Sequence, residues 1–219
     1  MNNRIFQIYY DEKSKLKVNL ESDFLYNKDL TVFFENLVIS EWFRVNYQQL
    51  DRIDYIGFLS YNFEDKNDML IPFESFKKGD YDIYTLGKTV FNHNVVLFGK
   101  TSHGKYFDIL FKQMCESVFN LSALQLDEIN LGVYQNAVVC KTYIYKQYVE
   151  NYLNPCIDWL VKYPYKDMLF SECKYNGKMS ERELLLKTGF PYYTFHTFLL
   201  ERLWSVFIHL NKDIYKVKI

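Results

Sequence analysis

The architecture of this chain follows from residues 54–63, Asp54-Tyr55-Ile56-Gly57-Phe58-Leu59-Ser60-Tyr61-Asn62-Phe63. The first half is an apolar run of β-forming residues that is too short for an independent helix. Such a run is typical of a strand buried on both faces, in a sheet covered by helices. At Ser60, Tyr61 and Asn62 the side chains become polar. Ligands of open α/β sheets bind outside the carboxyl ends of the strands, so these three residues are candidates for an active cleft.

The segments before this strand predict a strand–loop–helix–strand unit. Residues 4–10 are rich in β-branched and aromatic side chains and predict the first strand. The polar residues 15–29 predict a loop. Asp29 can cap a helix from about residue 30 to residue 45, where apolar residues recur at helical spacing. A turn at residues 48–52 then leads into the central strand, as in α/β proteins.

The end of the first strand offers a second set of candidates. Tyr9, Tyr10 and Asp11 lie where the first strand of a nucleotide-binding α/β fold commonly delivers residues to its ligand. The alternative is an ordinary junction between a strand and a turn. Both interpretations fit these residues equally well.

The middle of the chain combines regular elements with a segment that we expect to be a loop. Residues 71–78 predict one or two helical turns, and residues 81–86 a second core strand. Residues 91–104 predict an exposed loop, in which His93 and His103 are either contacts to phosphate or sugar, or solvated histidines. Residues 105–119 have the apolar spacing of an amphipathic helix.

The next segments predict a strand and several helices. Residues 130–140 predict a turn and a strand, with Gln135-Asn136 just before its most apolar part. A helix opens at Lys141-Thr142, is broken by Asn154-Pro155, and is followed by a short helix at residues 156–163. The polar segment 164–187 contains Ser180 and Glu183, which fit a capping box for one helix.

The last predicted helix, at about residues 194–211, carries one polar stripe. Thr197, Glu201, Ser205 and His209 recur every four residues, and Arg202 flanks them. On so apolar a helix the Glu201 carboxylate should be partly desolvated, which raises its pKa unless it is paired. Glu201 therefore has either a function or a salt bridge to an Arg or Lys from elsewhere.

The amino-acid composition limits the classes of function that fit this protein. Acidic and basic residues, 27 and 26 in number, nearly cancel, which argues against a nucleic-acid partner. The 20 Tyr and 19 Phe favour either a carbohydrate-contacting cleft or a core built from aromatic residues. The short opening before the first strand predicts no signal peptide, and no apolar run reaches the length of a membrane span.

The cysteines predict neither a zinc site nor a disulfide framework. They stand far apart, without a Cys-x-x-Cys pair and without a histidine at ligand spacing. Reduced, buried thiols in a cytoplasmic protein are the expectation. The four residues are Cys115, Cys140, Cys156 and Cys173.

Four segments together resemble the glycosyltransferases of bacterial capsule and lipopolysaccharide gene clusters. They are Ile5–Tyr10, Asp54–Ser60, Tyr134–Val139 and Phe198–Trp204. The resemblance implies a GT-A-like nucleotide-sugar-binding α/β fold, with a mixed, mostly parallel sheet covered by helices on both faces. The chain length fits a single domain over residues 1–219, with a helical excursion at 155–190. The resemblance also implies transfer of a sugar from a nucleotide-diphosphate sugar to a glycan or lipid-linked acceptor, in the cytoplasm or peripherally at the inner face of the membrane.

Functional residues follow from the same resemblance. Ser60-Tyr61-Asn62 occupies the place where metal-dependent relatives carry Asp-x-Asp, and it lacks both carboxylates, which leaves a need for Mn²⁺ or Mg²⁺ open and assigns no metal ligand. A second Asp-x-Asp match, Asp80-Tyr81-Asp82, starts a strand rather than ends one. Glu201 and Arg202 resemble the Glu-Arg-Leu motif and are the catalytic candidates, as general base and as partner of the diphosphate. The donor-binding candidates are Tyr9, Tyr10, Asp11, Ser60, Tyr61, Asn62, His103 and Asn136. The alternative function is a non-catalytic glycan- or nucleotide-sugar-binding protein with the same fold.

Overall fold

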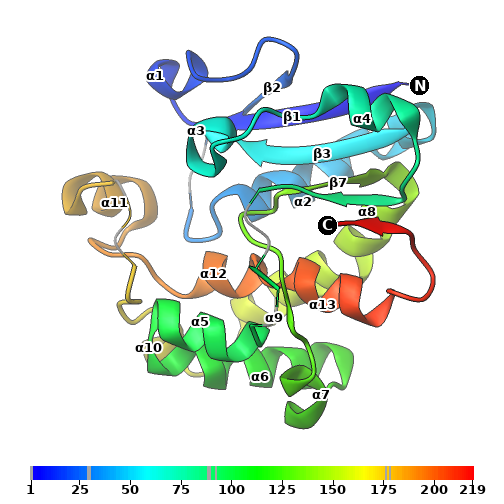
Figure 1. The fold of residues 1–219 in the computed structure, drawn as a ribbon. Coiled ribbons are helices and arrows are strands. Elements are labelled where there is room, and N and C mark those ends of the chain that lie inside the picture. Colours follow the sequence, from blue (N-terminus) through cyan, green and yellow to red (C-terminus); the bar gives the residue numbers. More distant parts are fainter. Residues whose placement is uncertain (1, 29–30, 88–89, 92, 176, 178) are drawn as a thin grey trace.

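The computed structural model describes residues 2–28, 31–87, 90–91, 93–175, 177 and 179–219 (Figure 1). Its centre is a sheet with the strand order β2-β1-β3-β7-β4-β8. β1 pairs in parallel with β2 and β3, and β4 pairs in parallel with β8, whereas β7 is antiparallel to β3 and β4. Among the described residues, five strands of this sheet therefore run in one direction and β7 runs against them. The strands are β1 (Asn3–Tyr9), β2 (Asp23–Tyr26), β3 (Tyr55–Ser60), β4 (Ile83–Thr85), β7 (Val138–Lys141) and β8 (Val217–Lys218).

The central strand β3 is buried along its whole length, as its apolar sequence predicts. Gly57 lies so close to β7 that a Cβ atom there would come within 2.5 Å of Val139 Cγ2. The register places Ser60 beside Ile8 of β1. The carboxyl ends of β1 and β3 therefore meet at one edge of the sheet.

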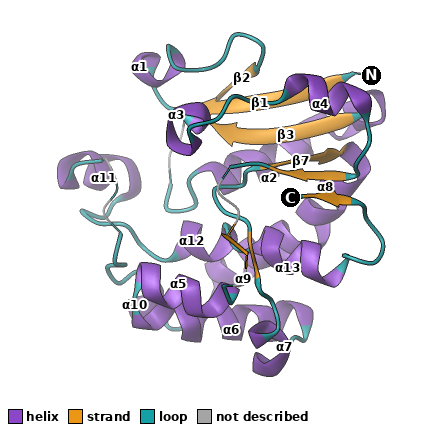
Figure 2. Ribbon diagram, in the orientation of Figure 1, coloured by secondary structure: helices purple, strands orange, loops and turns teal. Residues whose placement is uncertain are grey.

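Helices cover both faces of the sheet unequally (Figure 2). One face contributes Phe6, Ile56 and Phe58 to a large core shared with the long helices. The other face contributes Ile5, Leu59 and Tyr84 to a smaller core, which two short helices complete. The helices of the large core are α2 (Glu35–Asn46), α5 (Val95–His103), α6 (Lys105–Phe119), α8 (Thr142–Tyr148), α9 (Asn154–Lys162), α12 (His196–Leu200) and α13 (Leu203–Leu210); those of the smaller core are α3 (Phe63–Asn67) and α4 (Phe73–Lys78).

Smaller elements complete the described chain. They include a 3₁₀ helix at Tyr47–Arg52 and a two-stranded antiparallel sheet. The Ser180 hydroxyl and the Glu183 carboxylate form the predicted capping box. The elements are α1 (Glu12–Lys15), α7 (Ala123–Asp127), α10 (Lys166–Leu169), α11 (Glu181–Thr188), β5 (Val90–Phe91) and β6 (Leu131–Gly132).

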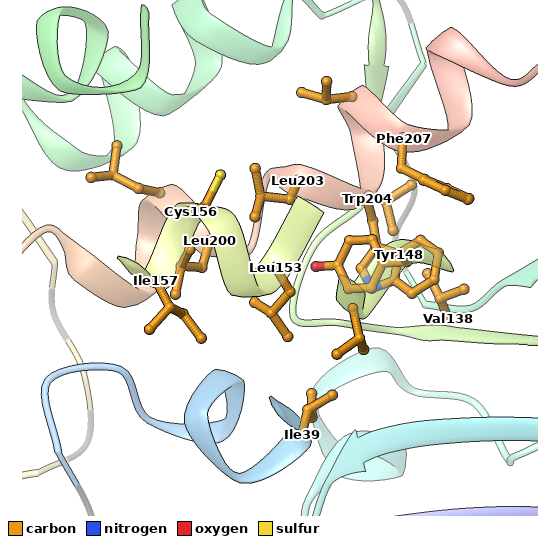
Figure 3. Close-up of a cluster of buried hydrophobic side chains, with 14 of the residues drawn as sticks. Ile39, Val138, Tyr148, Leu153, Cys156, Ile157, Leu200, Leu203, Trp204 and Phe207 are labelled. Carbon is orange, nitrogen blue, oxygen red and sulfur yellow. The ribbon is translucent and has the colours of Figure 1, made fainter. Parts of the chain in front are cut away.

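Aromatic side chains pack against one another in the core. Trp204 of α13 stacks on Tyr148 of α8, with ring centroids 3.7 Å apart and planes at 13° (Figure 3). Phe207 meets both rings edge-on. The high aromatic content thus serves packing to a large extent. The four cysteines are buried and free of disulfides.

Two segments that we predicted as loops contain regular elements. Residues 15–29 contain β2, an edge strand whose side chains are half buried or exposed and therefore give no core pattern. Residues 91–104 contain α5, because the Asn94 side chain accepts hydrogen bonds from the backbone N–H groups of Val96 and Leu97. Asn94 is a helix cap that the sequence reading took for a loop residue.

Two helix boundaries also differ from the prediction. α2 begins at Glu35 rather than near residue 30, and the proposed cap Asp29 lies outside the described residues. Pro155 does not break the helix: a π-helical turn at Val149–Leu153 joins α8 to α9. The Asn154 N–H bonds to the Val149 carbonyl five residues back, which places Pro155 at the start of α9, where its missing donor is tolerated.

No helix among the described residues has both the length and the apolar character needed to cross a bilayer.

Candidate functional site

A cavity of two joined compartments lies at the carboxyl ends of β1 and β3. The arginine compartment, of about 300 Å³, is lined by Ser60, His103, Tyr134, Asn136 and Arg202 among others. The aromatic compartment, of about 340 Å³, is lined by residues that include Tyr10, Phe34, Tyr61, Asn62 and Tyr193. Six residues line both compartments and form their border. They are Glu35, Lys66, Gln135, Tyr175, Phe198 and Glu201.

Glu201 and Arg202 enter this cavity from an interruption in the last helical segment. We predicted a single helix over residues 194–211, but the structure has two helices there: α12 ends at Leu200 and α13 begins at Leu203. The backbone between them is tightened, with the Arg202 N–H bonded to the Leu199 carbonyl three residues back. Apolar spacings of three and four fit both a regular and a tightened helix, so the sequence pattern could not reveal the interruption.

Arg202 is a buried cation with few partners. Its side chain is 3% exposed, its Nη2 lies 3.1 Å from Nε2 of His103, and its guanidinium lies over the Tyr134 ring at 4.3 Å. Nε and Nη1 have no hydrogen-bond partner among the described residues. A guanidinium carries five N–H donors, and leaving them unpaired in the interior is unfavourable. This arrangement is suited to an anion that enters the cavity.

His103 adds a second unpartnered donor. Burial, reinforced by the Arg202 charge, lowers its pKa to about 3, so the imidazole is neutral near pH 7. Arg202 can only donate, so Nε2 of His103 accepts and Nδ1 carries the proton. Nδ1 and the Tyr134 hydroxyl are both buried without a hydrogen-bond partner in the described part of the chain. His103 ends α5 and stacks on Phe198 at 4.2 Å, so it is not a solvated loop histidine.

Glu201 lies at the border of the two compartments, and the pKa of its carboxyl group is raised. Burial raises its pKa to about 7, Arg202 and Lys66 oppose this, and Glu35 adds to it. The nearest carboxylate oxygen is 3.8 Å from Nη1 of Arg202, which is too long for a hydrogen bond. Within the described residues we find no salt bridge from Glu201 to a distant Arg or Lys. The carboxyl group is therefore poised to exchange a proton near neutral pH.

The residues at the strand ends form a polar floor. The Ser60 hydroxyl donates to the Asn62 amide oxygen at 3.2 Å, and both side chains are buried. Tyr61 meets Tyr10 edge-on at 5.8 Å. Within the described residues, no group of three or more His, Cys, Asp or Glu side chains could hold a metal. Ser60 and Asn62 offer no carboxylate, the ligand with which divalent cations are usually bound, and their side chains bond to each other.

The turn before β7 brings Asn136 to the cavity in a strained conformation. Gln135 and Asn136 have φ of 60° and 52°, a left-handed region that non-glycine residues rarely adopt. The Asn136 amide donates to Asn36 at 3.1 Å, and Asn36 donates to Thr197 of α12 at 3.2 Å. This buried chain of hydrogen bonds holds the turn against α2 and α12. Strain of this kind clusters at functional sites.

The structure brings together eight of the ten site residues suggested by the sequence. Tyr9 and Asp11 lie outside the cavity. Successive side chains of a strand point to opposite faces, and Tyr9 stacks instead on Tyr26 at 5.1 Å. The Asp11 carboxylate accepts from the Ser14 N–H as the cap of α1, and this bond lowers its pKa. The residues brought together are Tyr10, Ser60, Tyr61, Asn62, His103, Asn136, Glu201 and Arg202.

Several lining residues were not singled out from the sequence. Two of them, Glu35 and Lys66, line both compartments. Tyr134 belonged to one of the resembling segments, which was the only signal for it. Asp82, by contrast, pairs with Lys141 at 2.7 Å and accepts from the Lys216 N–H, so the Asp80-Tyr81-Asp82 match is structural.

Another hollow, of about 500 Å³, lies beside Tyr55 and Lys141 at the opposite edge of the sheet. Lys141 is paired with Asp82 there, and the hollow lies by the amino end of β3. We therefore give it no catalytic role.

Scans against protein-family models, curated proteins and solved structures find no match for this chain. We therefore infer function from the chemistry of the cavity.

Proposed function

We propose that this protein is a glycosyltransferase, which moves a sugar from a nucleotide-diphosphate donor to a glycan or lipid-linked acceptor. One observation carries the proposal: the buried, under-bonded Arg202 lies beside a carboxyl group of raised pKa, in a cavity at the carboxyl ends of parallel strands. An α/β sheet places its ligands at this edge. The sequence resemblance to bacterial surface-polysaccharide transferases supports the same function.

The diphosphate of the nucleotide sugar matches the hydrogen-bond donors of the arginine compartment. Arg202, His103 Nδ1 and the Tyr134 hydroxyl supply N–H and O–H groups that lack partners among the described residues. Guanidinium groups bind phosphate through paired hydrogen bonds, and fixed donors stabilise the charge that develops on a leaving diphosphate. Lys66 at the border adds a further positive charge.

Glu201 is suited to the proton transfer of an inverting reaction. Its carboxylate takes the proton of the acceptor hydroxyl as that oxygen attacks the anomeric carbon. The bond from the anomeric carbon to the diphosphate oxygen breaks, and the nucleoside diphosphate leaves with the bonding electron pair. A base with a pKa of about 7 is matched to this step at neutral pH.

The aromatic compartment provides the flat surfaces that rings of a substrate need. Phe34 stacks with Tyr193 at 5.7 Å, and Tyr175 meets Tyr193 edge-on at 5.0 Å. Tyrosine rings offer an apolar face to a nucleobase or sugar, with a hydroxyl beside it. This compartment therefore suits either the nucleobase of the nucleotide sugar or a sugar ring of the acceptor.

Binding of nucleotides to wild type and Arg202→Met tests the proposal. UDP, GDP, UDP-glucose and GDP-mannose, with and without Mn²⁺, would be titrated calorimetrically. We expect at least one to bind wild type, and Arg202→Met to bind it about tenfold to a hundredfold more weakly, because a hydrogen bond to a charged group is lost. Because Arg202→Met leaves Glu201 without its neighbouring cation, a melting curve of the free variant would first check that it is folded.

Arg44→Met is the matched control, because Arg44 is exposed on α2 away from the cavity. It should leave nucleotide affinity unchanged. The proposal would be wrong if no nucleotide bound, or if folded Arg202→Met bound the same ligand as tightly as wild type.

A further inference from the structure

Glu35 places a second carboxylate at the border of the two compartments. It is the first residue of α2 and lines both compartments, together with Glu201 and Lys66. Its charge is felt at Glu201, whose pKa it raises. The proposed transfer reaction assigns Glu35 no role.

Tyr10 fixes the Glu35 carboxylate and leaves part of it available. The Tyr10 hydroxyl donates to Oε1 of Glu35. Burial, and then the neighbouring Glu35, raises the pKa of Tyr10 well above its ordinary value, so the phenol keeps its proton and remains a donor. Among the described residues, Oε2 of Glu35 has neither a hydrogen bond nor an ion pair. Glu35 lines both compartments, so its second carboxylate oxygen is left as an acceptor for a ligand in the cavity.

The border carries more negative than positive charge. Arg202, with the unpartnered donors of His103 and Tyr134, lies in the arginine compartment, whereas two carboxylates, Glu35 and Glu201, lie at the border with one described lysine, Lys66. On the proposed function, the anomeric carbon and the acceptor oxygen must come within reach of Glu201. The transferred sugar therefore lies at the border, next to Glu35, while its diphosphate reaches toward Arg202.

We infer that the transferred sugar is uncharged and that Glu35 selects it. Oε2 accepts a hydrogen bond from a hydroxyl of the sugar, and the same charge repels a sugar that carries a carboxylate. Like charges brought together disfavour the wrong ligand, which makes repulsion a means of discrimination. The substrate class is thus a nucleotide-linked hexose or N-acetylhexosamine rather than a nucleotide-linked uronic acid. This inference rests on the proposed function of the cavity.

Paired ligands that differ only at C6, where one carries a hydroxymethyl group and the other a carboxylate, test the inference. UDP-glucose with UDP-glucuronate, and GDP-mannose with GDP-mannuronate, would be titrated into wild type, Glu35→Gln and the control Glu41→Gln. Glu41 is an exposed residue of α2, so its change removes the same charge from the same helix without touching the cavity. For the nucleotide that binds, wild type should favour the neutral sugar by about tenfold or more.

Glu35→Gln should bind the uronate more tightly than wild type does and reduce the preference to about threefold or less, since its amide keeps the shape and removes the charge. Glu41→Gln should keep the wild-type preference. A uronate that binds wild type as tightly as the neutral sugar would overturn the inference, and so would an unchanged preference in folded Glu35→Gln. UDP and GDP alone report on the diphosphate site. If a nucleotide binds but neutral sugars are not preferred, the role of Glu35 in selecting the sugar is refuted and the proposed function stands. Failure of every ligand refutes both.

Discussion

Glu201 shows how one residue can connect stability and reactivity. Its side chain is 18% exposed, so it touches the cavity while most of it is packed in the protein. The cost of burying its charge is only partly offset by Arg202, whose guanidinium is 3.8 Å away and turned largely to His103 and Tyr134. The result is a pKa of about 7 instead of the ordinary 4.5. A carboxylate held in this way weakens the fold at the pH where it becomes a useful base.

The stability of Glu201→Gln relative to wild type should therefore depend on pH. Between pH 4.5 and about 7 the folded protein keeps a proton on Glu201 that the unfolded chain releases. Wild type thus loses stability as the pH rises through this window, and the glutamine variant does not. From about pH 5 to about pH 8 the variant should gain up to ~3 kcal/mol relative to wild type, at 1.36 kcal/mol per pKa unit.

Urea denaturation of both proteins across this range measures the difference in free energy of unfolding. Glu41→Gln, which changes an exposed carboxylate, should show a difference from wild type that stays constant with pH. If the difference for Glu201→Gln also stayed constant, the raised pKa of Glu201 would be refuted.

At the scale of single elements, α5 positions a functional residue by close packing. Gly99 lies against the Phe107 ring of α6, where a Cβ atom would come within 2.0 Å of the ring carbon Cε1. This contact fixes the position of α5, whose last residue, His103, lines the cavity. The glycine is therefore required by the close approach of two helices rather than by a turn.

Gly99→Ala should destabilise the protein by about 1–3 kcal/mol, because one of the two helices must shift. The shift should also move His103 and weaken nucleotide binding. Leu97→Ala is a matched control on the same helix, since Leu97 is 62% exposed. It should change the free energy of unfolding by less than about 0.5 kcal/mol. Denaturation curves and nucleotide titrations of the two variants check both effects, and a Gly99→Ala protein as stable as Leu97→Ala would contradict this packing argument.

The sequence predicted those elements whose burial follows a simple pattern. β3 is apolar because both its faces are covered, and α6 shows its apolar stripe because one side faces the core. α5 was missed because its glycine and polar residues are typical of a loop, although Gly99 serves packing and Asn94 serves capping. The division of the last helix at Glu201 was missed because it leaves the apolar spacing intact.

At the scale of the whole molecule, the topology of the sheet explains how distant residues meet. Tyr10 follows β1, Ser60 ends β3 and Asn136 precedes β7, while Glu201 arrives from the last helices. The rule that ligands bind at the carboxyl edge of such a sheet was enough to predict that several of these residues converge. It could not decide between Tyr9 and Tyr10, because that choice depends on which face each side chain takes. Glu35 was out of reach of the sequence, since only tertiary packing shows that the start of α2 lies at the border.

The most direct test of this account compares binding and turnover in Glu201→Gln. For a nucleotide sugar that binds wild type, the dissociation constant and the rate of nucleoside diphosphate release with glycan acceptors would be measured in both proteins. We expect the variant to bind the donor within about threefold of wild type and to release nucleoside diphosphate about 10²–10⁴-fold more slowly, as for loss of a general base. A variant that turns over the donor at the wild-type rate, or a wild type that binds the donor and never releases its diphosphate, would contradict the account.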